Sequence, residues 1–171
     1  SLEKHFKGKV VKFGKKNIKN IKLKGLSGSV FQLTINNELL TINLPLPGLY
    51  HIYDGLAALV IAHYLGLPAD KSFQDFQPAF GRFEKLPFGY IFLIKNPAGA
   101  AAVFETLAPQ LKKDDRLLLP LNDNLADGKD VSWIWDSNFE KLRTKNYELR
   151  TICSGTRAAD LALRLKYAGF D

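Results

Sequence analysis

The 171-residue sequence is 46% hydrophobic and 24% charged, which is typical of a globular protein that can bury a core. No apolar run approaches the roughly 18 residues that span a bilayer. The chain begins without an apolar signal core, its one cysteine is Cys153, and its three histidines lack a metal-ligand spacing. These features exclude an internal disulfide and a membrane span, and they predict a cytoplasmic protein with no metal site in this chain.

The net charge of +7 is concentrated at the N-terminal end. Residues 1–24 contain nine lysines and one acid, Glu3. This basic segment could bind the phosphates of nucleic acid or anionic lipid. It could equally be the solvent face of half-buried strands, because lysine alternates with apolar residues. We favour the second interpretation, since no arginine occurs among the lysines, and we expect no nucleic-acid partner.

The first 80 residues predict a small antiparallel sheet and a helix. Four alternating segments separated by turn residues are predicted as strands: 9–14, 17–25, 29–35 and 39–44. A proline-rich segment, 44–48, ends the sheet, and a helix follows over 49–65. The predicted buried stripe of this helix is Leu49, Ile52, Leu56, Leu59, Val60 and His63. Gly66 suits the end of the helix, and a short helix is predicted near 69–76.

From about residue 83, apolar strands alternate with helices. Strands are predicted at 89–95, 116–121 and 148–154, and helices at 97–111 and 156–169. Asn96 is expected to cap the first of these helices, with Pro97 at its first position. The second helix has a predicted buried stripe of Leu161, Ala162, Leu165 and Ala168. Its predicted solvent face contains Arg164, Lys166 and Tyr167.

This alternation predicts an α/β fold with a Rossmann-like, mainly parallel sheet that helices cover on both faces. The predicted domains are residues 1–80, which hold the small sheet and helix, and residues 81–171, which hold the α/β domain. In such sheets, ligands and partners bind where the carboxyl ends of the strands lead into loops.

One such loop has an unusual composition. Residues 122–136, NDNLADGKDVSWIWD, leave the carboxyl end of the strand 116–121 and combine four aspartates and two asparagines with both tryptophans of the chain. A plain surface loop would lack the tryptophans, and a buried strand would lack the aspartates. The segment 130–136 fits either a strand or a helical turn. The whole stretch is therefore a candidate functional site.

Five motifs carry a family resemblance. Two of them are LPLPGLYHIYDGLAA (44–58) and FGRFE (80–84), and the others are KNPAG (95–99), the stretch 122–136 and SGTRAADLALRLKYAG (154–169). The first two resemble sequences of Mur ligases, the ATP-dependent amide-forming enzymes of peptidoglycan synthesis. The other three narrow the resemblance to the C-terminal half of the Mur-ligase-like subunit of lipid II isoglutaminyl synthase, the MurT family. This resemblance implies a domain of the Mur ligase C-terminal type, preceded by a remnant of the Mur ligase central domain.

The resemblance also implies a reaction. The family amidates the α-carboxyl of D-glutamate in lipid II to give D-isoglutamine. ATP, with Mg²⁺, converts this carboxyl into an acyl phosphate, and ammonia from a glutaminase partner, GatD, displaces the phosphate. The phosphate-binding glycine loop and a cysteine-rich zinc ribbon belong to an N-terminal region of the family without a counterpart in this sequence. We therefore expect ATP and Mg²⁺ to act in the full-length enzyme, and zinc only in that region.

The same resemblance assigns binding residues. Arg82 would contact a phosphate of ATP, and a surface salt bridge is the alternative. His51 and Asp54 stand where the family has asparagines that help to hold the nucleotide. The candidates for binding an anion or the substrate near helix N-termini are Lys95, Asn96 and Arg157. Helix capping is the alternative interpretation for this group.

In the stretch 122–136, the resemblance implies that one aspartate is lent to the glutaminase. There it would orient the histidine of a Cys–His–Asp arrangement. The candidates are Asp127, Asp130 and Asp123 in that order, because the pair Asp127-Gly128 predicts a turn that projects outward. The alternative is a tightly turned loop with capping aspartates and core tryptophans.

Three functions remain open from the sequence. The chain is part of an ATP-dependent amidoligase subunit, or it is a docking module that binds the glutaminase without binding ATP. The least favoured possibility is a basic nucleic-acid-binding domain. The sequence contains neither a Gly-x-x-x-x-Gly-Lys-Ser/Thr phosphate loop nor a dinucleotide fingerprint, so the chain alone is expected to be inactive toward ATP.

Overall fold

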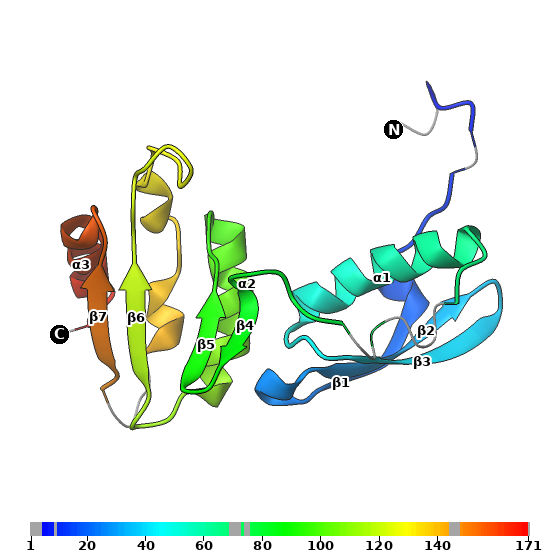
Figure 1. Cartoon of the computed structure of the whole chain (residues 1–171), viewed down its shortest axis with the longest axis horizontal. Coiled ribbons are helices and arrows are strands. Elements are labelled where there is room, and N and C mark those ends of the chain that lie inside the picture. Colours follow the sequence, from blue (N-terminus) through cyan, green and yellow to red (C-terminus); the bar gives the residue numbers. More distant parts are fainter. Residues whose placement is uncertain (1–4, 9, 69–72, 74–75, 144–147, 171) are drawn as a thin grey trace. The chain divides into compact units, whose positions relative to one another are not determined.

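The computed structural model describes residues 5–8, 10–68, 73, 76–143 and 148–170. The chain divides into two compact units, Ser1–Gln77 and Pro78–Asp171, and each is described by itself. Their helices and strands are labelled in Figure 1. The domain boundary predicted from the sequence lies between residues 80 and 81.

The first unit contains a three-stranded antiparallel sheet in the order β1-β2-β3. Its strands are β1 (Ile18–Leu23), β2 (Ser29–Ile35) and β3 (Glu38–Leu44). A two-residue turn, Asn36-Asn37, joins β2 to β3, and both asparagines have positive φ, 46° and 67°. Asparagine tolerates this backbone conformation better than most residues, so the turn helps to fix the register of the hairpin.

The predicted strand over residues 9–14 is wrong for the described residues 10–14, which form no strand. The backbone N–H of Gly14 donates to the side-chain oxygen of Asn17 over 3.0 Å, and Asn17 N donates to Gly14 O over 2.9 Å. These two bonds turn the chain into a 3₁₀-helix, Lys15–Asn17, directly before β1. The other three strands of this unit are confirmed, with small shifts at their ends. The short helix predicted near 69–76 falls largely outside the described residues.

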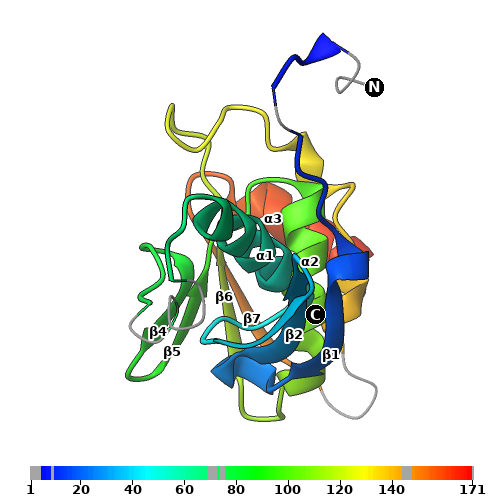
Figure 2. The ribbon, with the colours of Figure 1, turned by 90° about the vertical axis from the view of Figure 1, so that its right-hand side faces the viewer.

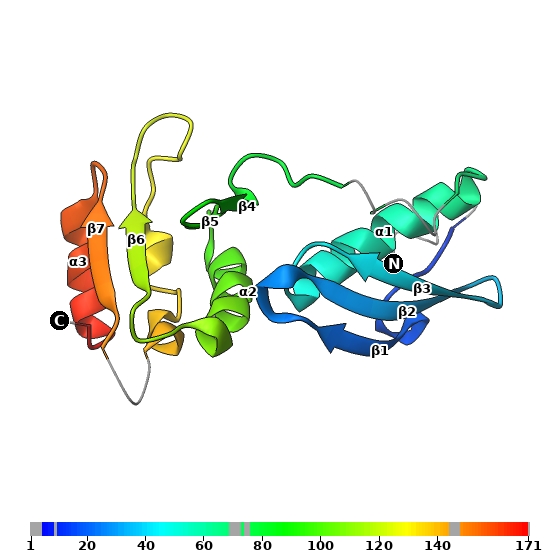
Figure 3. The same cartoon turned by 60° about the horizontal axis from the view of Figure 1, so that its bottom comes forward.

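The helix α1 (Leu49–Tyr64) covers one face of this sheet, as Figure 3 shows. Every second residue of β2 is buried, and α1 packs against that strand. The structure confirms most of the predicted helical stripe: Ile52, Leu56, Leu59 and Val60 are buried, and His63 is half-buried. The prediction that Leu49 is buried is wrong, because this first residue of the helix is 44% exposed. Gly66, with a φ of 71°, follows the helix end as predicted.

β1 contains the lysine alternation that predicts a half-buried strand, and this prediction is wrong beyond its first residue. Ile18 is the one buried residue of β1, while Ile21 and Leu23 are 39% and 56% exposed. β1 is an edge strand, and α1 packs against β2. The later apolar residues of β1 therefore remain in contact with solvent.

The second unit alternates strands and helices. Its strands are β4 (Arg82–Leu86), β5 (Gly89–Phe92), β6 (Arg116–Pro120) and β7 (Arg150–Ser154), and its helices are α2 (Pro97–Leu107) and α3 (Ala158–Tyr167). Short 3₁₀-helices lie at Ala108–Gln110, Ser132–Ile134 and Phe139–Leu142. β6 and β7 pair in parallel over their whole length, as the alternation predicts.

The strand predicted over 89–95 is shorter than expected and has a different partner. It ends at Phe92 and pairs antiparallel with β4. Phe83 of β4 lies at a bulge with a φ of 61°. Its buried ring packs against Tyr90 and Phe92 of β5, with ring centroids 5.2 and 5.3 Å apart. These aromatic contacts hold β5 in a hairpin, so β6 and β7 form the one parallel pair of the described residues.

Within the described residues, helices cover one face of β6 and β7, not both faces as predicted. Leu117, Leu119 and Cys153 pack against the core that α2 and α3 share. Leu118 and Ile152, which face each other across the two strands, are 63% and 44% exposed. Figure 2 shows α2 and α3 on the same side of these strands. Successive side chains of a strand point to opposite faces, and α2 and α3 pack on the face of Leu117, Leu119 and Cys153.

α3 buries a charged side chain that the sequence analysis assigns to solvent. Arg164 is 6% exposed, so that assignment is wrong. Its Nε donates to Ile134 O over 3.2 Å, and its Nη2 donates to Ser137 O over 2.7 Å and to both carboxylate oxygens of Glu140 over 3.0 Å. The guanidinium carbon also lies 5.5 Å from the centre of the Phe139 ring. A buried cation is tolerated here because its donors have acceptors.

The same contacts decide the conformation of the tryptophan segment. Residues 132–134 form a 3₁₀-helix, which confirms the helical-turn alternative for 130–136. Trp133 packs against the core, while Trp135 is 48% exposed and meets Tyr167 edge-on, with ring centroids 5.7 Å apart. In α3, Leu161, Leu165 and Ala168 are buried as predicted. Ala162 is exposed, so its place in the predicted stripe is wrong.

Replacing Arg164 by Met should destabilise the second unit by about 2–3 kcal/mol, because two backbone carbonyls lose a charged donor. Both tryptophans lie in this unit, so urea unfolding followed by tryptophan fluorescence reports on it selectively. Lys166→Met, at an exposed position of the same helix, is the matched control and should shift the midpoint little. Equal midpoints for the two variants would contradict a stabilising role for the buried guanidinium.

Candidate functional site

The candidate site lies where β6 and β7 end, because the loops that leave these strands are bonded to each other. Leu121 N donates to Ser154 O over 2.9 Å, and Arg157 N donates to Leu121 O over 3.0 Å. The side-chain oxygen of Asn122 accepts from Thr156 N over 3.0 Å. These bonds continue the parallel pairing beyond the strands, so the start of the 122–136 stretch is held against the start of α3.

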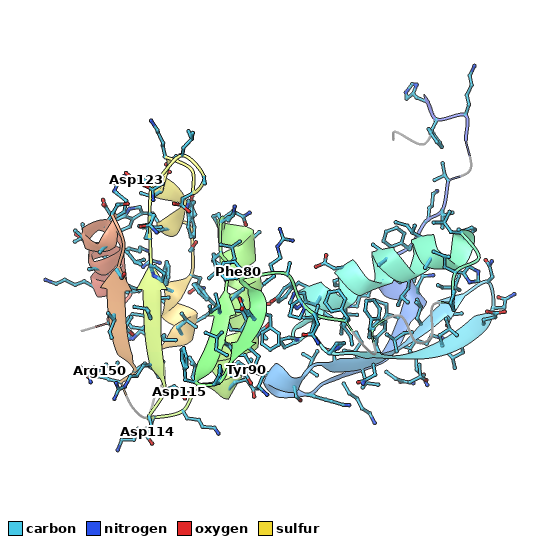
Figure 4. The ribbon with its side chains drawn as sticks, in the orientation of Figure 1. Phe80, Tyr90, Asp114, Asp115, Asp123 and Arg150 are labelled. Atoms are coloured by element: carbon cyan, nitrogen blue, oxygen red, sulfur yellow. The ribbon has the colours of Figure 1, made fainter. Side chains whose placement is uncertain are left out.

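Asp123 completes this connection. The Thr156 hydroxyl donates to Asp123 Oδ1 over 2.7 Å, and Asp123 N donates to Thr156 Oγ1 over 3.1 Å. Gly155 between the strand and this threonine has a φ of 95°, and a Cβ there would lie 2.3 Å from Leu121 O. Glycine is therefore required for the two loops to approach so closely. In Figure 4, Asp123 lies at the edge of the second unit from which the yellow loop leaves β6.

Arg157 joins the same network as a cation between two carboxylates. Its Nη1 lies 3.3 Å from Asp123 Oδ2, and its Nε lies 2.7 Å from Asp160 Oδ2. The Thr156 hydroxyl and the Arg157 guanidinium hold the pKa of Asp123 below its ordinary value. Asp123 is thus an ionised bracing residue whose carboxylate is already engaged. The two flanking carboxylates also neutralise much of the charge with which Arg157 would attract an anion.

The other two candidate aspartates differ from each other in how they are held. Asp130 accepts from Ser132 N over 2.8 Å, and the hydrogen bonds from Ser132 lower its pKa. This carboxylate therefore binds the first N–H of the 3₁₀-helix Ser132–Ile134, as expected for an aspartate that holds a tight turn. Asp127 is exposed, and its carboxylate accepts a hydrogen bond from the Asn124 side chain over 3.2 Å. Asp127 is therefore the candidate whose carboxylate is most available to another molecule.

Asp127 lies in a closed turn. Asp127 N and Gly128 N both donate to Asn124 O, over 2.9 and 3.1 Å, and Gly128 has a φ of 89°. The residues of this turn, from Asn124 to Gly128, are all exposed. The predicted Asp127-Gly128 turn is therefore present.

Three further candidate residues lie elsewhere in the second unit. Arg82 is an exposed residue at the start of β4. Lys95 is exposed, and Asn96 caps α2, because its side-chain oxygen accepts from Gly99 N over 2.7 Å. Figures 1 and 3 show that the loops after β5, β6 and β7 leave the same edge of the unit. Asn96 and Arg157 thus begin helices at the edge from which the 122–136 loop also leaves.

His51 and Asp54 lie on α1 in the first unit, apart from the other candidates in the chain. His51 is buried, and its Nδ1 lies 2.7 Å from Pro47 O. A carbonyl oxygen only accepts, so Nδ1 is the protonated nitrogen of the neutral ring. Burial lowers the pKa of His51, and the Pro47 carbonyl and the nearby Asp54 carboxylate oppose this shift without cancelling it. Asp54 is exposed.

Neither a membrane-spanning helix nor a cluster of metal-binding side chains occurs among the described residues. Among the residues that the structure describes, no helix is long and apolar enough to cross a membrane. In the same residues, no group of three or more histidine, cysteine or acidic side chains could hold a metal ion.

Asn122 and Thr156 hold the two loops together, and neither residue is singled out by the sequence patterns described above. A signal for them exists in the sequence: a polar pair follows one predicted parallel strand, and Gly-Thr follows the other. Arg164 was missed because a helical stripe predicts a solvent face from periodicity alone.

Comparison with solved structures identifies the fold class. The chain superimposes on MurF from Acinetobacter baumannii with a TM-score of 0.62 at 18% sequence identity, covering 90% of this chain and 35% of that one. A folylpolyglutamate synthase from Mycobacterium tuberculosis gives a TM-score of 0.51 at 23% identity over 88% of this chain and 41% of that one. The mixed α/β architecture is therefore that of the Mur ligase fold.

The sequence comparisons identify the family. The family model described as MurT ligase C-terminal matches residues 93–171. The chain is 37% identical over 143 residues to the lipid II isoglutaminyl synthase (glutamine-hydrolyzing) subunit MurT of Staphylococcus aureus strain COL, covering 80% of this chain and 32% of that protein. It is 38% identical over 132 residues to the subunit of the same name from Streptococcus pneumoniae R6, covering 72% of this chain and 29% of that protein. The chain belongs to the MurT family, and it spans about a third of the length of these curated relatives.

The burial of His51 predicts a pH-dependent stability for the first unit. Because the folded-state pKa is lowered, the unfolded chain binds the proton more readily, so stability should fall as the pH drops below the ordinary histidine value of about 6.5. His51→Asn should reduce this dependence between roughly pH 7 and pH 5, measured as urea midpoints by circular dichroism. His63→Asn, on the same helix, is the control and should keep the dependence. An unchanged dependence in His51→Asn would show that another group causes it.

Proposed function

We propose that this chain is part of the synthetase subunit that amidates the D-glutamate α-carboxyl of lipid II to D-isoglutamine. The reaction uses ATP and ammonia from a GatD-like glutaminase, and it takes place in the cytoplasm at the inner face of the membrane. Membership of the MurT family supports this assignment. The role proposed for this region rests on Asp127. Its exposed carboxylate accepts a hydrogen bond from Asn124 and lies on a loop that other contacts hold at both ends.

Amide formation from a carboxylate needs activation, because a carboxylate is a poor electrophile. ATP would supply the phosphoryl group, and the protein contributes mainly charge neutralisation and positioning. Arg82 suits a phosphate contact, because it is exposed and its fork of N–H donors matches phosphate oxygens. Lys95, also exposed, and the N-terminus of α2 at Asn96 suit a carboxylate or phosphate of the substrate.

Asp127 would act on the partner. A glutaminase cysteine attacks the side-chain amide of glutamine as a thiolate, and a neighbouring histidine takes its proton. A carboxylate on the far nitrogen of that histidine fixes the tautomer and stabilises the imidazolium that forms. A carboxylate supplied from the synthetase subunit would keep glutamine hydrolysis slow until the two chains assemble, so that ammonia forms where it is used.

A second candidate function is a docking module that binds the glutaminase and does not bind ATP itself. The state of His51 favours it for this chain, because the ring is buried and its Nδ1 is bonded to Pro47. Asp54, one helical turn later, is an anion and would repel a nucleotide phosphate. In this function Asp127 and its loop keep their role, and the nucleotide contacts are lost.

Asp127→Asn should leave folding and glutaminase binding unchanged, because the substitution is nearly isosteric and the side chain is exposed. Glutamine hydrolysis by the complex should fall by about two to four orders of magnitude, since the amide cannot stabilise the imidazolium. Ammonia release from glutamine measures this effect. Asp130→Asn and Asp123→Asn are the matched controls. Full activity in all three variants would refute the lent carboxylate.

The chain alone should not hydrolyse ATP and should bind Mg-ATP no better than about millimolar, because it contains no glycine-rich phosphate loop. Isothermal titration calorimetry measures this directly. Arg82→Ala is the matched variant for any binding that does occur. Micromolar binding that weakens in Arg82→Ala would contradict the docking module and show that the phosphate contact is already made by this chain.

A further inference from the structure

The tip of the 122–136 stretch exposes a large apolar side chain near the exposed carboxylate of Asp127. Leu125 is 89% exposed, more than any other leucine that the structure describes. It lies two residues before Asp127, and the lent-carboxylate proposal gives it no role. Because most of this leucine side chain is exposed to water, burying it against a partner would favour association.

The loop that holds Leu125 is fixed at its first end. Asn122 and Asp123 are bonded to Thr156, and Asp123 also pairs with Arg157. These partners lie between the end of β7 and the first residue of α3. The loop therefore leaves the sheet in a direction that the parallel strands set.

The second end of the loop is fixed as well. Asp130 accepts from Ser132 N at the start of the 3₁₀-helix, and Val131 and Ile134 are buried in the core. Arg164 holds the carbonyl of Ile134. α3 thus anchors both ends of the segment 124–130, through Arg157 at its N-terminal end and Arg164 near its C-terminal end.

Within the segment, Leu125 and Asp127 share one closed turn. Asn124 O accepts from Asp127 N and Gly128 N, and the Asn124 side chain reaches the Asp127 carboxylate. Because hydrogen bonds within the chain already close this turn, less conformational entropy is lost on association than for an open loop. Leu125 and Asp127 are two residues apart in the chain, so their Cα atoms are separated by at most about 7 Å.

We propose that Leu125 is the docking residue of this loop and inserts into an apolar pocket of the glutaminase chain, beside the histidine that Asp127 reaches. This inference rests on the proposed function. The occupant is a protein surface rather than a phosphate-bearing polymer or membrane, because carboxylates outnumber cations in residues 122–130 and would repel phosphates. The three carboxylates are Asp123, Asp127 and Asp130, and the one cation is Lys129. The leucine provides affinity and the aspartate provides catalysis, so the two effects are separable.

The test uses the full 171-residue chain and a purified GatD-type glutaminase. Leu125→Ala should raise the dissociation constant of the pair about tenfold or more, because the buried methyl groups are lost. At a low concentration of the Leu125→Ala chain, glutamine hydrolysis by the pair should be slow. It should recover as the concentration of this chain approaches saturation. Asp127→Asn should show the opposite pattern, with unchanged binding and slow hydrolysis at saturation. Biolayer interferometry and ammonia release measure the two quantities.

Leu163→Ala is the matched control, because Leu163 lies on the exposed side of α3, is 50% exposed and undergoes the same chemical change. It should bind as the unaltered chain does. If Leu125→Ala binds as tightly as Leu163→Ala, or if both lose affinity equally, the docking role of Leu125 is overturned. If the unaltered chain neither binds nor activates the glutaminase, the proposed function fails first, and this outcome is distinct from the failure of Leu125 alone.

Discussion

The second unit depends on a buried cation that joins two separate segments of the chain. Arg164 reaches from α3 to the carbonyls of Ile134 and Ser137 and to the Glu140 carboxylate, so it joins the helix to a segment about 30 residues earlier in the chain. That segment has little regular structure of its own apart from two short 3₁₀-helices. A guanidinium can satisfy several acceptors at once in a fixed geometry, which a lysine ammonium on a flexible stem does less well.

The functional consequence is a loop whose ends are fixed and whose tip is free. The Asn122–Thr156 and Asp123–Arg157 contacts hold one end, and the contacts of Arg164 hold the other. Between them, the polar side chains divide into those that build the loop and those that face outward. Asp123 and Asp130 belong to the first kind, since hydrogen bonds already lower the pKa of each. Asp127 belongs to the second kind.

The parallel pairing of β6 and β7 explains why these groups meet. Both strands point toward the same edge, so the residues that follow them lie side by side although they are more than 30 positions apart. Gly155 permits the closest approach, because a side chain there would collide with the Leu121 carbonyl. The N-terminal ends of α2 and α3 lie at the same edge, as expected for an α/β unit of the Mur ligase fold.

The sequence by itself determined the features that local chemistry controls. Turn residues and alternation identified the strands β1, β2 and β3, helical spacing identified α1, α2 and α3, and Asn96 with Pro97 identified the start of α2. The outward turn at Asp127-Gly128 followed from the same kind of local signal. Each of these predictions depends on residues within one or two turns of each other, where backbone propensity and capping dominate.

Only the tertiary structure decided which charges are buried and which strands pair. Arg164 has the same spacing on its helix as a solvent residue, and its burial follows from acceptors that a distant segment provides. The hairpin of β4 and β5, the packing of α2 and α3 on one face of β6 and β7, and the engagement of Asp123 by Thr156 are likewise contacts between separate parts of the chain. Periodicity describes one element at a time, whereas these outcomes depend on the free energy of bringing two elements together.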